Sequence, residues 1–268
     1  MSFIDALLLG LVEGITEFLP VSSTGHLILA RSLLGLEGEA VDRMLIVIQG
    51  AAILAICWEY RHRLTATVRQ IGSSAEARRF TLNMFVAFLP LAVLGLLLEK
   101  SIERVLFSPI PVSIALVVGG ALILWAERRT HRESIPSVDE LRVPDAVKLG
   151  FFQALALVPG TSRSAATILG GLLIGMSRRA ATEFSFFLAI PTLIAATLYK
   201  LWEAREALTI DELGVLAVSS VAAFASALVT VRLFVRFVSG HTFTGFAWYR
   251  IVFGIAILLS WATGLVRW

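Results

Sequence analysis

The sequence predicts an all-α, polytopic integral membrane protein with six transmembrane helices, two re-entrant helix hairpins and two inverted-topology repeats. Composition predicts the membrane class: 57% of the 268 residues are hydrophobic and only 16% are charged, and the mean hydropathy is +0.83. A typical soluble domain is about 45–50% apolar and about 25% charged. The net charge of +3 and the pI of about 9.4 therefore indicate basic loops that set membrane topology, not a surface for nucleic acid.

The first two apolar segments are too short or too interrupted to be ordinary spans. Residues 1–19 have a helical pattern but carry Glu13 and Glu17, and Pro20 then breaks the helix. The next apolar piece, 26–36, would be about 17 Å long at 1.5 Å per residue, whereas the hydrocarbon core is about 30 Å thick. We therefore expect a re-entrant hairpin that enters and leaves the membrane on one side.

Six longer apolar stretches can each cross a membrane. They are predicted at 41–59, 80–98, 109–126, 182–200, 213–235 and 244–266. A polar linker, 127–145, separates the third span from the fourth. A second short pair follows the linker, at 146–158 and 165–175, and the break between its members contains Pro159 and Gly160. We expect this pair to be re-entrant as well.

The order of a hairpin followed by three spans occurs twice, which predicts repeats at 1–126 and 146–268 joined by the cytoplasmic linker 127–145. At an offset of 140 residues, Ser22-Ser23-Thr24 falls on Ser162-Arg163-Ser164. Three spans in each repeat give the repeats opposite orientations. Their broken tips should then meet near the membrane midplane, as they do in proteins built from inverted repeats.

Basic residues predict the orientation of the chain. They are concentrated in four loops, at 60–79, 127–148, 176–181 and 236–241. The remaining loops are neutral or acidic, at 99–108 and 201–212. Because Lys and Arg gather in cytoplasmic loops, the four basic loops are predicted to be cytoplasmic and both termini periplasmic.

The first broken tip gathers ionisable and hydroxyl groups. Glu13 and Glu17 are four residues apart, so they share a helix face, where like charges repel. In a low-dielectric site, one carboxyl group must be protonated or a cation must bridge both, and oxygen ligands suit Mg²⁺ or Ca²⁺. The hydroxyls that follow can cap the next helix or bind phosphate at its N-terminus: Ser22, Ser23 and Thr24.

Two further groups complete the predicted site. His26 stands one turn into the short helix, where it could act as general acid or base, or as nucleophile. Arg163, in the second tip, would cost about 2.5–3.5 kcal/mol at the midplane and therefore needs an anionic partner. Its planar fork fits phosphate oxygens, although a salt bridge to Glu13 or Glu17 would also satisfy it. Together the tips predict a site for a phosphate or diphosphate whose lipid tail stays in the bilayer.

Two long motifs carry a resemblance to a known family. They are EGITEFLPVSSTGH at 13–26 and PGTSRSAAT at 159–167, and the second continues to Pro191. On these motifs the chain resembles the bacterial undecaprenyl-diphosphate phosphatase family, also called the bacitracin-resistance protein family. One departure stands at Met44-Leu45, where that family often has an acidic residue after an aromatic one.

The resemblance implies hydrolysis of undecaprenyl diphosphate to undecaprenyl phosphate and inorganic phosphate, which recycles the carrier lipid for peptidoglycan synthesis and confers bacitracin resistance. It also implies a divalent cation, Mg²⁺ or Ca²⁺, a homodimer, and a site in the bacterial inner membrane that opens to the periplasm.

The resemblance also implies roles for individual residues. By position, Glu13 and Glu17 resemble metal ligands or acid/base groups. Ser23 or His26 resembles the nucleophile, and Arg163 resembles the phosphate clamp. The implied phosphate-contacting residues are Ser22, Thr24, Gly160, Ser162, Arg163, Ser164 and Thr167.

A transporter or flippase of an anionic polyprenyl lipid is the alternative function, because inverted repeats with broken helices are typical of transporters. Transport requires charge complementarity but no nucleophile beside a general base. The hydroxyls and His26 next to two carboxylates therefore favour the enzyme. Arg250, in the last predicted span, could snorkel or contact lipid, and the pattern does not decide between them.

Overall fold

The computed structural model describes residues 1–106, 108–129, 133–203 and 213–265. Within these residues the regular structure is helical, with one isolated bridge between Ile135 and Met176. The α-helices are α1 (Phe3–Thr16), α2 (Ser23–Leu33), α3 (Glu39–Glu59), α4 (Arg61–Gln70), α5 (Ala75–Leu106), α6 (Pro109–Glu127), α7 (Val143–Ala154), α8 (Arg163–Leu173), α9 (Arg178–Glu203), α10 (Leu213–Val238) and α11 (Thr244–Ala262). Two 3₁₀ turns accompany them, η1 (Val138–Glu140) and η2 (Leu155–Leu157).

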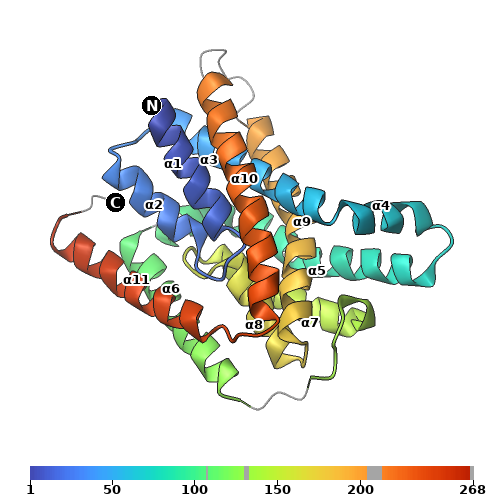
Figure 1. Cartoon of the computed structure of the whole chain (residues 1–268). Coiled ribbons are helices and arrows are strands. Elements are labelled where there is room, and N and C mark those ends of the chain that lie inside the picture. Colours follow the sequence, from blue (N-terminus) through green and yellow to red (C-terminus); the bar gives the residue numbers. More distant parts are fainter. Residues whose placement is uncertain (107, 130–132, 204–212, 266–268) are drawn as a thin grey trace.

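Six of the described helices are long and apolar enough to cross a membrane: α3, α5, α6, α9, α10 and α11. They coincide with the six predicted spans, and the prediction of an all-α, multi-pass membrane protein is confirmed. Residue 266 of the last predicted span and most of the predicted loop 201–212 lie outside the described residues. Figure 1 shows the N-terminus and the end of α11 on the same side of the view, opposite α4.

Besides α4, which has 10 residues, four described helices are too short to cross alone. α1, α2, α7 and α8 contain 14, 11, 12 and 11 residues, so none exceeds about 21 Å at 1.5 Å per residue. The hydrocarbon core is about 30 Å thick. The pairs α1–α2 and α7–α8 are therefore consistent with the two expected hairpins, and their re-entrant path through a membrane stays a prediction.

The prediction of a loop at 60–79 is wrong. Residues 61–70 form α4, and α5 begins at residue 75 and continues to 106, through most of the predicted loop 99–108. Figure 1 shows α4 and the start of α5 extending together beyond the other helices. The error has a physical cause: α4 buries none of its residues, so it lacks the apolar face by which a helix is recognised in a sequence.

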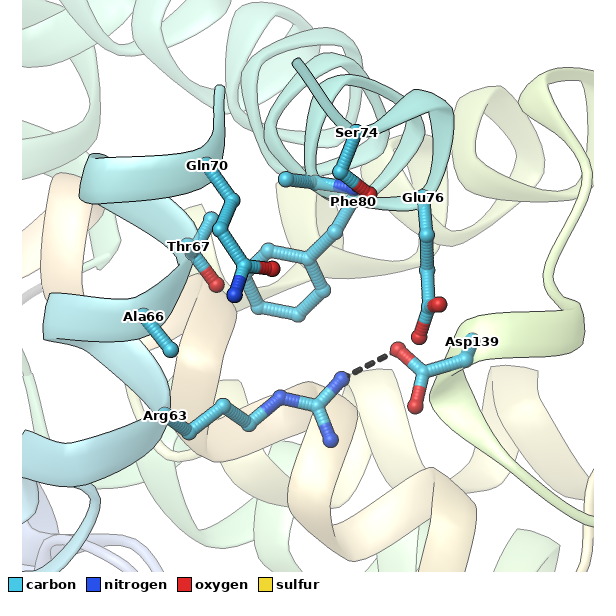
Figure 2. A pocket seen from close by; sticks show the side chains of 9 residues that line it. Arg63, Ala66, Thr67, Gln70, Ser74, Glu76, Phe80 and Asp139 are labelled. Carbon is cyan, nitrogen blue, oxygen red and sulfur yellow. Dashed lines mark hydrogen bonds and ion pairs between the residues drawn. The ribbon is translucent and has the colours of Figure 1, made fainter. Parts of the chain in front are cut away.

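The α4–α5 extension is fastened to the linker. A cavity of about 210 Å³ lies between α4, α5 and η1, and Figure 2 shows Arg63 reaching across it to an ion pair with Asp139. The backbone oxygen of Asp139 also accepts a hydrogen bond from Arg79, at 2.5 Å. The Arg63 guanidinium lies 4.9 Å from the ring centres of both Phe80 and Phe187. These contacts dock η1 against the extension.

The most extensive helix contacts join the two halves of the chain. α1 and α3 pack along α10, α6 packs along α11, and α5 packs along α7. Glycines permit this closeness: a Cβ added at Gly14 would lie 2.3 Å from the Ala223 backbone oxygen, and one at Gly150 would lie 2.7 Å from the Ala87 backbone oxygen. Small residues have this role at interfaces between membrane helices. The packing surrounds the α1–α2 and α7–α8 turns with helices from both halves.

Candidate active site

The two broken tips, distant in sequence, meet in the structure. The Ser164 hydroxyl donates a hydrogen bond to the Leu19 backbone oxygen at 2.7 Å, and Arg163 forms an ion pair with Glu17 at 3.4 Å. The meeting of the tips, expected from the repeated order of elements, is therefore present in the structure.

Each tip starts its short helix with the same device. Ser22 caps α2 and Ser162 caps α8, and each side-chain oxygen accepts a hydrogen bond from the backbone N–H three residues later. Both serines have a positive φ, 74° and 68°. Such a conformation costs a residue with a side chain on the order of 1–3 kcal/mol and is found where the surrounding structure enforces it, often at functional sites. Both short helices therefore begin with the same serine cap and the same positive-φ turn.

Glu17 lies between a hydroxyl and a guanidinium. Its Oε2 accepts a hydrogen bond from Ser23 Oγ at 2.5 Å, and its Oε1 faces Arg163 Nη2 at 3.4 Å. The three residues are buried, each exposing 9% or less of its surface. A carboxylate held against a hydroxyl in this way can take the proton of that hydroxyl and make its oxygen a nucleophile.

Arg163 is oriented by α9. Its Nη1 donates hydrogen bonds to Ser185, to the backbone oxygen at 2.8 Å and to the hydroxyl at 3.5 Å. Thr167, one turn further along α8, donates to the same Ser185 hydroxyl at 2.7 Å. Among the described residues, Arg163 Nε is buried without a hydrogen-bond partner. The orientation of the guanidinium is therefore fixed, and its Nε–H remains available to donate a hydrogen bond.

His26 faces α11. Its Nδ1 lies 2.7 Å from the Ser22 backbone oxygen and its Nε2 lies 2.6 Å from the Tyr249 hydroxyl. A carbonyl oxygen only accepts, so Nδ1 carries the proton and neutral Nε2 accepts from Tyr249. The imidazole also stacks on Phe253, with ring centres 4.1 Å apart. Both ring nitrogens are therefore engaged, and His26 helps to hold the cap residue Ser22 through its backbone oxygen.

The environment of Glu13 indicates whether the site suits a divalent cation. Its side chain is 1% exposed, and within the described part of the chain its Oε1 has no hydrogen-bond partner. The described residues contain no group of three or more His, Cys, Asp or Glu side chains arranged for a metal. A magnesium ion that is shared with substrate phosphates needs only one or two carboxylates. The orphaned Glu13 oxygen beside Glu17 fits a cation of that kind.

The tips open into a cavity of about 610 Å³. Its polar end is lined by the tip residues Glu17, Ser22, Ser23, Thr24, Gly160, Ser162 and Arg163. Its apolar wall comes from α5 and α9, with Phe88, Leu91, Leu96 and Leu193 among the lining residues. A charged end joined to a long apolar wall suits an amphiphile with an anionic head.

Four predicted site residues lie outside the cavity lining: Glu13, His26, Ser164 and Thr167. The hydroxyls of Ser164 and Thr167 are already bonded within the protein, so they fix the second tip. Sequence reasoning missed three groups that shape the site, namely Gln49, Ser185 and Tyr249. Ser185 was within reach, because it continues the second motif, whereas the Tyr249–His26 contact spans 223 residues and left no local signal.

These features define a class of protein: a multi-pass membrane protein with a buried hydroxyl, carboxylate and guanidinium at the meeting point of two broken helix pairs. The family model described as bacitracin resistance protein BacA matches residues 6–256. The chain belongs to this bacterial family.

Curated relatives are similar over almost the whole chain. A protein of Nitrosomonas europaea named undecaprenyl-diphosphatase is 57% identical over 265 residues, which cover 99% of this chain and 97% of the relative. A protein of the same name from Aromatoleum aromaticum is 55% identical, with the same coverage. An undecaprenyl-diphosphatase 2 of Rhodospirillum rubrum is 57% identical over 266 residues, again 99% and 97% of the two chains.

Proposed function

We propose that the protein is a membrane-embedded diphosphatase that hydrolyses undecaprenyl diphosphate to undecaprenyl phosphate and inorganic phosphate. One observation carries the proposal: the Ser23 hydroxyl lies 2.5 Å from the Glu17 carboxylate, whose other oxygen faces Arg163. A nucleophile, a general base and a phosphate-binding cation are thus within reach of one another. The names of the relatives supply the substrate. The reaction would regenerate the carrier lipid for peptidoglycan synthesis and so oppose bacitracin.

In the first step, Ser23 Oγ attacks the terminal phosphorus of the diphosphate while Glu17 accepts the hydroxyl proton. The bond from that phosphorus to the bridging oxygen breaks. The leaving undecaprenyl phosphate takes the proton from Glu17, which returns to the carboxylate form. Arg163 balances the negative charge on the phosphoryl group during transfer.

In the second step, a water molecule attacks the phosphoserine. Glu17 accepts a proton from the water, the bond between phosphorus and Ser23 Oγ breaks, and Glu17 returns the proton to that oxygen. Inorganic phosphate leaves and Ser23 is restored. One water molecule is consumed in each turnover.

Glu13 and Glu17 would hold a divalent cation, Mg²⁺ or Ca²⁺. When bound, the ion would neutralise part of the diphosphate charge. The support for this assignment is the buried Glu13 oxygen that has no partner among the described residues.

Ser23 is preferred to His26 as the nucleophile, because both nitrogens of His26 are engaged, by Ser22 and Tyr249. The two assignments predict different phosphoenzymes. A phosphoserine survives acid, whereas a phosphohistidine is hydrolysed by it. Rapid quenching with ³²P-labelled prenyl diphosphate should therefore trap an acid-stable label that Ser23→Ala abolishes. An acid-labile label lost in His26→Ala would contradict the preference.

The decisive experiment measures phosphate release by purified protein in detergent from a C55 or shorter prenyl diphosphate. We expect activity that EDTA abolishes and that His26→Ala reduces by at least about 100-fold, because loss of the imidazole that binds the Ser22 backbone oxygen would displace the neighbouring Ser23 hydroxyl. The alternative is a transporter of an anionic polyprenyl lipid. Transport in vesicles without phosphate release from any prenyl diphosphate would favour that alternative.

The two halves are further proposed to be inverted repeats, 1–126 and 146–268, joined by the linker 127–145. The matched serine caps at an offset of 140 residues and the packing of helices across the halves support this. We place both termini and the mouth of the site on the periplasmic side of the bacterial inner membrane, in a homodimer. Labelling single cysteines, introduced into a Cys57→Ala background, with an impermeant reagent tests the orientation, and light scattering in detergent tests the dimer.

A further inference from the structure

Arg250 is an intramembrane arginine to which the proposed mechanism gives no role. It stands in the first half of α11, and its side chain is completely buried, at 0% exposure. Neither snorkelling nor lipid contact describes it, because both would leave part of the side chain exposed. Ionisable residues in membrane helices are rare and mark functional sites.

The guanidinium of Arg250 joins the two tips. Its Nη1 donates a hydrogen bond to the Pro20 backbone oxygen at 3.2 Å, and its Nη2 donates to the Gly160 backbone oxygen at 3.1 Å. A third bond goes to the Ala115 backbone oxygen on α6, at 3.2 Å. Pro20 and Gly160 are separated by the same 140 residues that relate the serine caps. One side chain therefore holds the equivalent turn of each tip.

The surrounding helices leave space for this group. A Cβ added at Gly119 would lie 2.3 Å from Arg250 Nη2, and one at Gly160 would lie 2.4 Å from the Val112 backbone oxygen. Glycine at both positions is thus required for the arrangement seen. The close packing of α6 on α11 delivers the guanidinium to a slot between the tips, where an ordinary side chain at 119 would displace it.

The charge of Arg250 is not balanced by a carboxylate within the described residues, since none of their ion pairs includes it. Its hydrogen-bond partners are three neutral carbonyl oxygens, and its Nε is buried without a partner in the described structure. Buried charges are normally paired. The nearby Arg163 differs, because Glu17 balances it. Arg250 thus carries a positive charge next to Gly160, a cavity-lining residue, that no ion pair among the described residues balances.

We propose that Arg250 is a positioning residue for the diphosphatase reaction, a role that rests on the function proposed above. Ser23 lies three residues after Pro20, and Arg163 lies three residues after Gly160. By tying the two carbonyls together, Arg250 keeps the attacking hydroxyl and the phosphate clamp on the same phosphoryl group. Its unbalanced charge draws the diphosphate head into the cavity.

Three variants separate geometry from charge: Arg250→Lys, Arg250→Met and Gly119→Ala. The quantities to measure are kcat and KM for farnesyl diphosphate, the melting temperature, and the affinity for a non-hydrolysable farnesyl methylenediphosphonate. Arg250→Lys keeps the charge but cannot bridge three carbonyls as a fork, so kcat should fall at least about tenfold with KM nearly unchanged, since small displacements of reacting groups are costly. Arg250→Met loses both the charge and the bridge between the carbonyls, so kcat/KM should fall at least about 100-fold.

The control is Arg232→Met, which removes an exposed cation of α10 that pairs with Glu59 and should leave kcat, KM and diphosphonate affinity unchanged. A folded Arg250→Lys protein with wild-type kcat would overturn the proposal. So would an Arg250→Met protein whose sole defect is a lower melting temperature. If Arg250→Met does not fold, Gly119→Ala decides, because it displaces the guanidinium while keeping it: wild-type kcat there overturns the proposal, and a selective fall in kcat supports it.

Failure of the proposed function would look different. The wild-type protein would then release no phosphate from farnesyl diphosphate at all. Diphosphonate binding would still test Arg250, since wild-type binding that Arg250→Met weakens at least about tenfold supports the electrostatic part, and equal binding contradicts it.

Discussion

The two tips share a backbone plan and differ in their side chains. In each, a short helix ends, a turn follows, and a serine with positive φ caps the next helix: Ser22 in the first tip and Ser162 in the second. At the next position the first tip has Ser23 and the second has Arg163. The first side chain is a hydroxyl, which we propose as the nucleophile, and the second is a cation, so the same backbone plan places two different groups at one cavity.

The helices that lead into the tips differ in the same sense. Glu13 in α1 corresponds to Gln153 in α7, and both are fully buried. Gln153 is satisfied, because it donates to the Ala87 backbone oxygen and accepts from Thr192. Glu13 keeps an oxygen without a partner in the described structure. Gln153 of the second half is thus held by neutral hydrogen bonds, whereas Glu13 of the first half keeps a buried carboxyl oxygen without a partner in the described structure.

The largest effect should come from removing the group that only the first tip has. Ser23→Ala should lower kcat for prenyl diphosphate by at least about a thousandfold, because the residual rate would come from binding and charge stabilisation alone. Ser226→Ala is the matched control, since within the described part of the chain that hydroxyl bonds only to backbone oxygens of its own helix, α10. A Ser23→Ala enzyme within tenfold of the wild type would remove the covalent step and leave direct attack by water.

The second tip should give the next largest effect. Arg163→Ala should lower kcat/KM by at least about 100-fold, the cost of losing a donor aimed at developing charge. Arg163→Lys should not restore it, because a lysine cannot contact Ser185, Glu17 and a phosphate in the geometry of a guanidinium fork. Phosphate release measured against substrate concentration distinguishes the variants, with Arg232→Ala as the control. Full activity in Arg163→Ala would refute the role of the second tip.

Replacing Glu13 by the glutamine of the second half should weaken the binding of the proposed divalent cation. Glu13→Gln installs the residue that α7 carries at the equivalent position and removes the carboxylate that we propose as a metal ligand. The Mg²⁺ concentration for half-maximal activity should therefore rise about tenfold or more, while kcat at saturating Mg²⁺ changes less. Titration of activity with Mg²⁺ after EDTA treatment provides the measurement. Glu59→Gln, which changes a half-buried carboxylate on α3 that pairs with Arg232, is the control. An unchanged Mg²⁺ requirement in Glu13→Gln would exclude Glu13 as a ligand.

The spans and the meeting of the tips could be predicted from the sequence because each leaves a local signal. Long apolar stretches mark the six spans, and Pro20 and Pro159-Gly160 mark the breaks. The order of elements, compared between halves, predicted that the tip with Arg163 meets the tip with Glu13 and Glu17. Composition and motifs therefore predict the spans and the residues at the two broken turns.

Other features depend on contacts between distant residues. α4 is a polar helix with no buried face, and hydropathy could not separate it from a loop. The place of Arg250 follows from α6–α11 packing at Gly119 and from carbonyls of both tips. His26 similarly depends on Tyr249, and its position in the motif gave no hint of that partner. Backbone carbonyls are present at every residue, so no pattern in the sequence indicates which of them an arginine will use.

The smallest predicted effect concerns the backbone that the two tips have in common. If the left-handed conformation at Ser22 and Ser162 is enforced equally, each serine should respond alike to two replacements. Alanine loses the cap, worth about 1 kcal/mol, and keeps the strain of a positive φ. Glycine loses the same hydrogen bond but adopts the conformation freely.

At both positions the glycine variant should therefore melt at a higher temperature than the alanine variant, by an amount corresponding to about 1 kcal/mol. Thermal unfolding in detergent, followed by circular dichroism, provides the measurement. If alanine equals glycine at one tip but not at the other, the two turns do not share a conformational requirement, and their likeness is limited to the hydrogen bond.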